Sequence, residues 1–231
     1  MPALLTPTEI SAFWLSVKIG LWCTALTAIP GVILGWLLAR KQFYGKALVD
    51  GLVHLPLVLP PVVPGYLLLL LLGRRGPLGQ WLYQTFGVTL AFNWKGAVIA
   101  SAVMALPLMV RAVRLAMSLV DTRLEEAARI LGAGSWRVFF TITLPLSLPG
   151  VLTGLILAFA RSLGEFGATI TFVGNIAGET RTLPLAIVTA TQTPGGEAQA
   201  LRLALLSLLL ALGALLASEI AARHSQRSLG A

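Results

Sequence analysis

An arginine and a glutamate stand four residues apart beside a long apolar stretch of this sequence. Arg161 and Glu165 follow the uncharged window 138–160. Residues four apart share one face of a helix, and ionisable groups at membrane depth usually face the protein interior. Two interpretations follow. Arg161 offers positive charge to a passing anion that Glu165 holds or gates, or the two residues form an ion pair that closes the packing near the membrane surface.

Side chains that would support catalysis do not cluster in the sequence. There is no phosphate loop of the form G-x4-G-K-[ST], so we expect no P-loop ATP site. Cys23 is the single cysteine, which excludes an internal disulfide and a cysteine metal cluster. The two histidines, His54 and His224, are far apart along the chain. We therefore predict no catalytic residue, no metal site and no cofactor, and a chain that is not itself an enzyme.

The composition is typical of a protein whose solvent is the lipid bilayer. Hydrophobic residues make up 57% of the 231 residues and charged residues only 11%, whereas soluble domains carry about 25% charged residues. The net charge is +8, but the basic residues lie mostly between apolar segments, as membrane topology signals do. No basic stripe with interleaved aromatic residues is present, so we expect no nucleic-acid partner.

The apolar segments predict an all-α, polytopic membrane protein with five transmembrane helices. A spanning helix needs about 20 mostly apolar residues, and such spans are expected at about 13–39, 52–73, 95–118, 145–165 and 201–221. A sixth stretch, 182–196, is too short and polar to cross easily. It predicts a partial or broken helix, which is tolerated where it is buried in protein or lines a cavity. Residues 1–231 are expected to form a single integral membrane domain.

The second expected span contains an unusual run of prolines. Pro56, Pro60 and Pro64 are spaced four apart, with Pro61 beside them. Each proline removes a backbone donor and disfavours helix at the residue before it, so a straight helix through residues 55–65 is not expected. The segment is either an irregular lead-in at the membrane edge or a broken helix at a transport pathway. Pathway or gate candidates are Pro60, Pro61, Pro64, Arg161 and Glu165.

Residues 121–145 predict a short amphipathic helix outside the spans. Thr122 and Glu125 match the capping box that begins a helix, and Gly132 and Gly134 are expected to end it. A second amphipathic piece, 136–142, leads into Pro145 and the next span. A helix of this kind either lies in the membrane interface or places its apolar face in the groove of a partner.

The distribution of Lys and Arg predicts the orientation of the chain. With five spans and the N-terminus outside, more of these cations lie on the inner side, where positive charge is usually in excess. The inner cations would be Arg40, Lys41, Lys46, Arg111, Arg114, Arg123, Arg129, Arg137, Arg223 and Arg227.

The segment 126–145 resembles a known family signature. Glu126-Ala127-Ala128, Gly132 after three residues, and Ile142-x-Leu-Pro145 after nine more match the EAA motif of the membrane subunits of binding-protein-dependent ABC importers. The resemblance implies the type I importer permease fold, with a cytoplasmic coupling helix that docks on a separate ATPase, where ATP hydrolysis would reside. The coupling residues it implies are Glu125, Glu126, Ala127, Ala128, Leu131 and Gly132.

Further stretches resemble the molybdate permease branch of this family. They are 54–61, 73–76, 160–168 and 174–187, and the similarity extends from about residue 10 to 222. It implies a bacterial inner-membrane permease with a periplasmic N-terminus and a cytoplasmic C-terminus. Its implied partners are a second copy of the chain, two ATPase subunits and a periplasmic molybdate-binding protein, with molybdate as cargo. Sulfate, thiosulfate and tungstate permeases remain alternatives, as does an ATP-independent anion channel or carrier.

Overall fold

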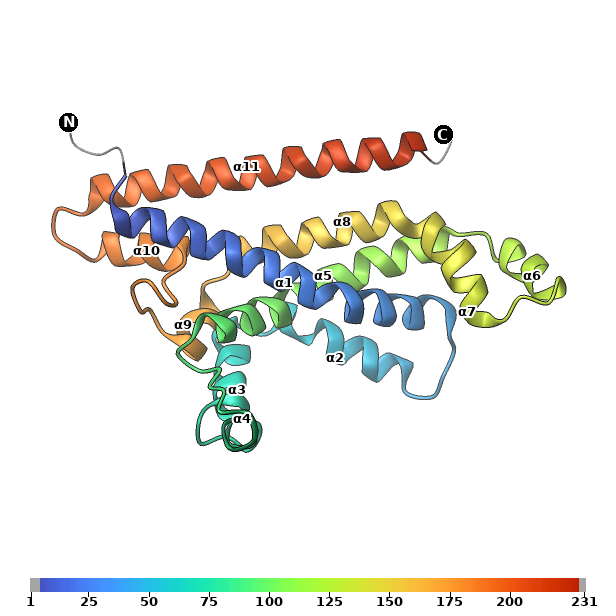
Figure 1. The fold of residues 1–231 in the computed structure, drawn as a ribbon, viewed down its shortest axis with the longest axis horizontal. Helices are drawn as coiled ribbons and strands as arrows, with labels where there is room; N and C mark the ends of the chain where they lie inside the picture. The colour runs from blue at the N-terminus through green and yellow to red at the C-terminus, as the bar shows by residue number, and fades with distance from the viewer. Residues whose placement is uncertain (1–4, 229–231) are drawn as a thin grey trace.

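The computed structural model describes residues 5–228, with side chains described for residues 5–216. The predictions that rest on Arg223, His224 and Arg227 fall outside those side chains. The described chain is helical throughout, which confirms the predicted all-α class (Figure 1). Its elements are α1 (Pro7–Arg40), α2 (Lys46–Val58), α3 (Val62–Leu72), α4 (Pro77–Phe86), α5 (Trp94–Leu119), α6 (Thr122–Ile130), α7 (Ser135–Val138), the π-helical turn η1 (Phe139–Thr143), α8 (Leu144–Leu163), α9 (Gly167–Val173), α10 (Leu183–Thr191) and α11 (Glu197–Ser228).

Within the described residues, four helices are long and apolar enough to cross a membrane on their own. They are α1, the continuous run Ser135–Leu163, α5 and the described part of α11. A fifth crossing arises if α2 and α3 are counted together, although they are bent by 113° at their break. The bend lies at 59–61, where Pro60 and Pro61 prevent helical hydrogen bonding. The segment is therefore a broken helix rather than an irregular lead-in, and Pro56 lies inside α2.

The long helices run along one axis, with α6 at one end of the molecule and α10 at the other (Figure 1). We call these the α6 end and the α10 end. Local signals set where α1 and α5 begin. Thr6 and Glu9 form a capping box at the start of α1, in which the Thr6 N–H donates to Glu9 Oε2 over 2.6 Å. The side chain of Asn93 accepts from the Lys95 N–H at the start of α5.

The centre of the fold is formed by α1, α5 and α8. A Cβ atom added to Gly35 of α1 would lie 2.6 Å from Val113 Cγ1, and one added to Gly31 would lie 2.3 Å from Met109 Cγ. These glycines therefore let the backbone of α1 approach α5 closely. Met109, Val113 and Met117 are fully buried in the cluster that results. The tight packing makes α1 and α5 one mechanical unit.

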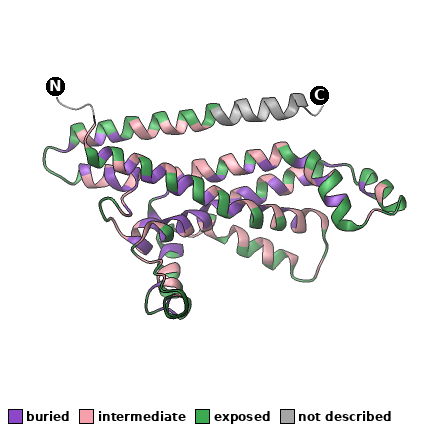
Figure 2. Ribbon diagram, in the orientation of Figure 1, coloured by how far each residue is buried: buried purple, intermediate pink, exposed green. Residues whose placement is uncertain are grey.

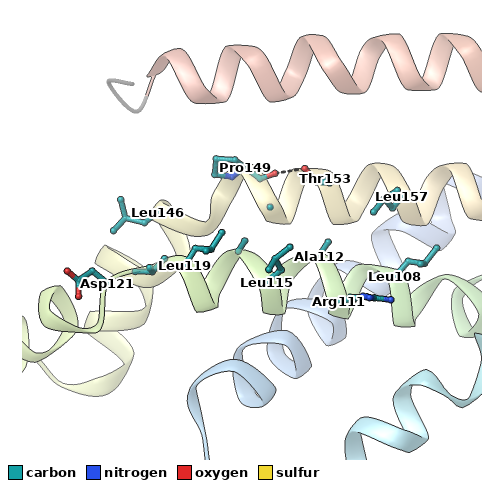
Figure 3. A pocket seen from close by; sticks show the side chains of 13 residues that line it. Leu108, Arg111, Ala112, Leu115, Leu119, Asp121, Leu146, Pro149, Thr153 and Leu157 are labelled. Carbon is teal, nitrogen blue, oxygen red and sulfur yellow. Dashed lines mark hydrogen bonds between the residues drawn. The ribbon is translucent and has the colours of Figure 1, made fainter.

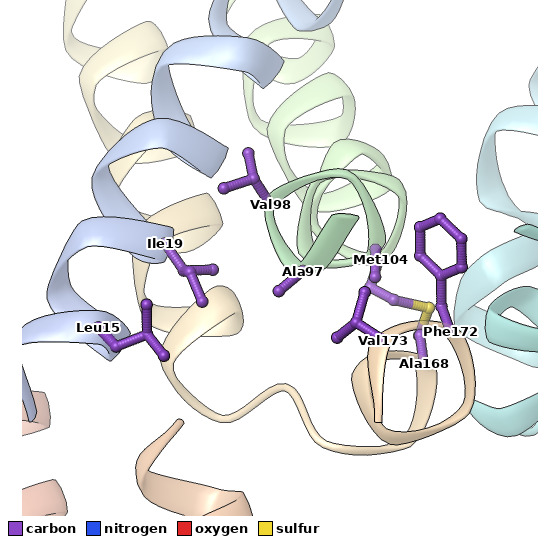
Figure 4. Packing of buried hydrophobic residues seen from close by; sticks show 9 residues of the cluster. Leu15, Ile19, Ala97, Val98, Met104, Ala168, Phe172 and Val173 are labelled. Carbon is purple, nitrogen blue, oxygen red and sulfur yellow. The ribbon is translucent and has the colours of Figure 1, made fainter. Parts of the chain in front are cut away.

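A second buried cluster lies toward the α10 end (Figure 4). The cluster contains Ile19 of α1, Ala97 and Met104 of α5, and Phe172 of α9. Phe172 lies on the side of α5 opposite Ile19 (Figure 4). The short helix α9 is thus held between α3 and α5 although it follows the last turn of α8 by only a few residues.

The remaining helices leave large apolar surfaces uncovered (Figure 2). No residue of α2 is buried, and 11% of the apolar window of α11 is buried, against 67% for α5. Exposed leucines on these helices match a bilayer or another membrane helix as surroundings. At the α10 end, α11 is bonded to α1 by Arg202 Nη2, 3.0 Å from Glu9 Oε1.

One sequence expectation needs correction at the end of α8. The helix ends at Leu163 with Gly164 as its cap, so Glu165 lies outside it and does not share a helix face with Arg161 in the regular sense.

The partial helix predicted within 182–196 is confirmed. It is the nine-residue α10, which packs against α11 and α1.

Candidate functional site

The amphipathic segment after α5 forms the short helix α6, but the predicted capping box is wrong. The cap is Asp121, one residue earlier, whose side chain accepts from the Arg123 N–H over 2.9 Å. Glu125 does not reach back to the start of the helix, because its carboxylate is bonded to other helices. Aspartate directly before a helix is a common N-cap, so the sequence did contain a signal for Asp121. The prediction placed the cap one residue later because Thr122 is also a common N-cap residue.

The end of α6 depends on a glycine in the left-handed conformation. Gly132 has φ +86°, its N–H donates to the Arg129 carbonyl, and the Ala133 N–H donates to the Ala128 carbonyl. This pair of bonds is a Schellman cap, so the prediction that Gly132 ends the helix is confirmed. Gly134 has φ −67° and lies at the start of α7 instead.

Glu125 is the buried residue of α6, with 6% of its surface exposed. Its Oε1 accepts from Thr143 Oγ1 over 2.8 Å and lies 3.0 Å from Arg40 Nη2. Arg129, one turn later, lies 3.7 Å from Oε2. The carboxylate therefore joins α6 to the last residue of α1 and the last residue of η1, and it faces inward.

The other predicted coupling residues face outward or are half-buried. Glu126, Ala127 and Gly132 are exposed and Ala128 is half-buried. Leu131 is 88% exposed, and the neighbouring Ile130, which the sequence analysis did not single out, is 86% exposed. Apolar side chains this exposed beyond the ends of the spans are compatible with both sequence interpretations, a contact with the membrane interface or with another protein.

At the α6 end, aromatic side chains from α1, α7 and η1 pack together in one cluster. Trp36 of α1 stacks on Trp136 of α7, with ring centroids 6.4 Å apart, and meets Phe139 edge-on at 5.5 Å. Phe140 continues the cluster beside Trp136. The Lys41 Nζ lies 5.5 Å from the Trp36 ring. These contacts fix α7 and η1 to the end of α1.

At the other end of α8, Arg161 and Glu165 form an ion pair, which was one of the two interpretations of their spacing. Arg161 Nη1 lies 2.7 Å from Glu165 Oε2, and Glu165 Oε1 accepts from the Ala168 N–H over 2.8 Å. The Glu165 side chain is 2% exposed and the Arg161 side chain 25%. The carboxylate thus ties the end of α8 to the first turn of α9.

The structure brings this pair close to the proline break. A Cβ atom on Gly167 would lie 2.5 Å from Pro61 Cβ, and one on Gly65 would lie 2.8 Å from Ala168 Cα. The break between α2 and α3 therefore packs directly on α9, whose first turn Glu165 holds. Pro64 is buried at this contact, whereas Pro60 is exposed. Gly65 and Gly167 were not predicted from the sequence, because close approach between distant segments leaves no local signal.

A separate groove of about 700 Å³ lies between α5 and α8 (Figure 3). Leu108, Leu115, Leu146 and Leu157 line it, with Asp121 at one end in the view. None of the predicted coupling or pathway residues lines this groove. Its apolar walls suit a lipid chain or another membrane helix. Among the described side chains, no three His, Cys, Asp or Glu residues come together as metal ligands do.

Comparison with known proteins gives consistent matches over nearly the whole chain. The profile of the family described as "Binding-protein-dependent transport system inner membrane component" matches residues 31–228. The "Molybdenum transport system permease protein ModB" of Escherichia coli K12 is 60% identical over 227 residues, covering 98% of this chain and 99% of the relative. Its namesake in Haemophilus influenzae is 59% identical over 223 residues, covering 96% and 97%.

A solved structure supports the fold independently of close sequence similarity. It is described as inward-facing conformations of the MetNI methionine ABC transporter, and it matches with a TM-score of 0.71. The match covers 97% of this chain and 99% of that chain at 17% identity. At this identity the likeness concerns the arrangement of helices.

Proposed function

Because this chain belongs to the binding-protein-dependent transport system inner membrane components, we propose that it forms the translocation pathway of an ATP-driven molybdate importer. The chain is a permease subunit of an ABC importer and a multi-pass protein of the inner membrane. The observation that carries the choice of cargo is near-full-length identity of about 60% to permeases named for molybdenum transport. Identity at that level over both chains favours a shared cargo.

The α6 end is the proposed docking site for a separate ATPase, on which ATP would be hydrolysed. Exposed Glu126, Ala127 and Leu131 supply the contact surface, and Gly132 sets its shape. The α6 end would then face the cytoplasm and the α10 end the periplasm. In this orientation α1 begins outside and α11 runs toward the inside, which gives a periplasmic N-terminus and a cytoplasmic C-terminus.

Two copies of the chain are proposed to pair around the conduit, with residues 1–231 of each forming a single membrane domain. The uncovered apolar faces of α2, α3 and α11 support this. Two ATPase subunits would bind the paired α6 helices, and a periplasmic molybdate-binding protein would deliver the anion to the α10 end.

The gate is proposed at the contact between the proline break and α9. Pro60, Pro61 and Pro64 make the bend, and Arg161 and Glu165 hold the opposing helix α9. The Arg161–Glu165 pair favours a structural role for Arg161 at this gate, because its charge is already matched by Glu165. A conduit also works best with weak binding to its cargo.

Uptake of labelled molybdate into proteoliposomes tests the function. The vesicles hold this chain with its ATPase and binding protein, with ATP on the ATPase side and excess sulfate or tungstate competing outside. ATP-dependent uptake that resists sulfate supports the proposal. If sulfate inhibits the uptake of labelled molybdate, the chain is a sulfate permease. If only tungstate inhibits it, the chain is a permease for molybdate and tungstate. Uptake without ATP or ATPase overturns the importer in favour of a channel or carrier.

Co-purification with the ATPase tests the docking surface separately. Leu131→Ser removes an exposed apolar side chain without disturbing a buried one, so it is expected to weaken ATPase binding about tenfold or more while the fold is retained. Arg123→Gln, on the same helix, is the matched control. Unchanged binding of Leu131→Ser would remove Leu131 from the interface.

A further inference from the structure

The helix α6 is connected to the helical body by few side chains. Its main neighbours are α7 and η1, and otherwise it stands apart at its end of the molecule (Figure 1). Glu125 is its buried side chain, and that side chain reaches past α7 to Thr143 and Arg40. Movement imposed on α6 from outside can therefore reach the body through this carboxylate, as well as through the chain at 120–121 and the contacts with α7 and η1.

Arg40 joins three helix ends with one nitrogen atom. Its Nη2 donates to the Val120 carbonyl at the end of α5 over 2.7 Å and lies 3.0 Å from Glu125 Oε1. Arg40 is itself the last residue of α1. The side chains of Arg40 and Glu125 are 12% and 8% exposed, so water screens their attraction weakly. The pair is a firm link from α6 to the ends of α1 and α5.

The link has room beside it. A cavity of about 190 Å³ is lined by Trp36, Arg40, Glu125 and Arg129, among others. The buried Nε of Arg40 has no hydrogen-bond partner among the described residues. The pair therefore borders a hollow, while its remaining bonds, from Arg40 to the Val120 carbonyl and from Thr143 to Glu125, hold it in place.

The opposite end of α1 carries a matching pair. Glu9, whose side chain is fully buried, accepts from Arg202 of α11 through Nε at 3.1 Å and Nη2 at 3.0 Å. Between the two pairs, Gly31 and Gly35 hold α1 tightly on α5. The helix α1 thus carries an ion pair at each end, one to α6 and one to α11, and between them it packs closely on α5 beside its internal proline, Pro30.

We propose that Arg40 and Glu125 form the internal connection that carries movement of α6 into α1 and so toward the α10 end, with Glu125 as a positioning residue and not as part of the ATPase-binding surface. This inference rests on the proposed function, because it assumes that an ATPase moves α6. It divides the two adjacent glutamates by role: Glu126 faces the partner and Glu125 faces the membrane domain.

The experiment compares Glu125→Gln with Arg123→Gln, an exposed charge change on the same helix, in proteoliposomes with the ATPase and binding protein. Glu125→Gln is expected to retain ATPase binding, but its molybdate uptake per ATP hydrolysed should fall about tenfold, within the usual range of coupling between sites. Arg123→Gln should match the wild type.

Two results would overturn the proposal: unchanged uptake per ATP in Glu125→Gln, or loss of ATPase binding, which would place Glu125 in the docking surface. If Glu125→Gln does not fold, Arg40→Lys replaces it, since lysine keeps the charge but its shorter side chain ends before the Nη2 position that contacts both Val120 and Glu125. For Arg40→Lys as well, unchanged uptake per ATP or loss of ATPase binding would overturn the proposal.

Amide hydrogen exchange tests the link without any transport assay. In Glu125→Gln, exchange should accelerate both in residues 122–130 and at the α6 end of α1, whereas Arg123→Gln should leave α1 unchanged. Unaltered exchange in α1 would overturn the connection even if the wild type transports molybdate. A wild type that shows no ATP-dependent uptake would instead refute the proposed function, and the exchange result would still decide whether the link exists.

Discussion

Glu165 lies beyond the last turn of α8, yet its Oε2 is 2.7 Å from Nη1 of Arg161 inside that helix. The chain turns at Gly164, and the carboxylate folds back over the helix end while its other oxygen accepts from the Ala168 N–H. One side chain thereby neutralises an arginine and holds the start of α9. The arrangement favours a structural pair over an open anion site.

The two members of this pair should differ in their effect on stability. Arg161→Met leaves a carboxylate that is 2% exposed without its cation, and an uncompensated buried charge costs about 3–5 kcal/mol. Glu165→Gln keeps an oxygen for the Ala168 N–H and leaves the more exposed Arg161, so it should cost less. Thermal unfolding of the purified protein measures the order, and the double variant should recover part of the loss. If Arg161→Met instead keeps its thermal stability but loses uptake, Arg161 serves the anion.

The cap of α6 gives a prediction that separates adjacent residues. Asp121→Ala removes the side-chain acceptor for the Arg123 N–H and should destabilise α6 by about 1 kcal/mol. Thr122→Ala should cost much less, since the structure assigns its hydroxyl no capping bond. Hydrogen exchange in residues 122–126 is the measurement. A larger effect at Thr122 would restore the capping box that the sequence predicts.

Gly132 and Gly134 should respond differently to the addition of a small side chain. Gly132 has φ +86° and open space around it, so Gly132→Ala meets backbone strain of about 1–2 kcal/mol without a clash. Gly134 has φ −67° and is equally open, so Gly134→Ser should be tolerated. We expect Gly132→Ala to lower ATPase binding and uptake while Gly134→Ser retains both. Equal loss in both variants would mean that bulk, and not backbone conformation, limits this turn.

The close contact between α3 and α9 should not accept a side chain. In Gly65→Ala the new Cβ would lie 2.6 Å from the Ala168 carbonyl oxygen, and overpacking of this kind costs about 1–3 kcal/mol. Gly51→Ala on α2, with nothing within 4 Å, is the helical control. Gly65→Ala is expected to lower both thermal stability and uptake, and Gly51→Ala neither. Wild-type behaviour of Gly65→Ala would show that α3 and α9 separate easily, as a gate that opens widely would require.

The apolar segments and the EAA spacing were sufficient to predict the helical membrane class and the amphipathic helix ended by Gly132. The prolines predicted that residues 55–65 do not form a straight helix, and the structure decided for a broken helix over an irregular lead-in. Hydrophobic length, proline chemistry and glycine conformation are local properties, and they act within a few residues of the chain. The spacing of Arg161 and Glu165 placed them near each other but left open whether they form an ion pair or serve an anion.

Whether a side chain points into the protein or outward depends on neighbours that are distant in sequence. Only the tertiary structure decided this for the residues of the site. Glu125 and Glu126 are adjacent and chemically identical, yet one is buried against Arg40 and Thr143 and the other is exposed. The contact of Gly65 with Ala168, and the ion pairs at the two ends of α1, likewise join residues far apart in the chain. Sequence determined the elements of this protein, and packing between those elements determined which of its charges connect them.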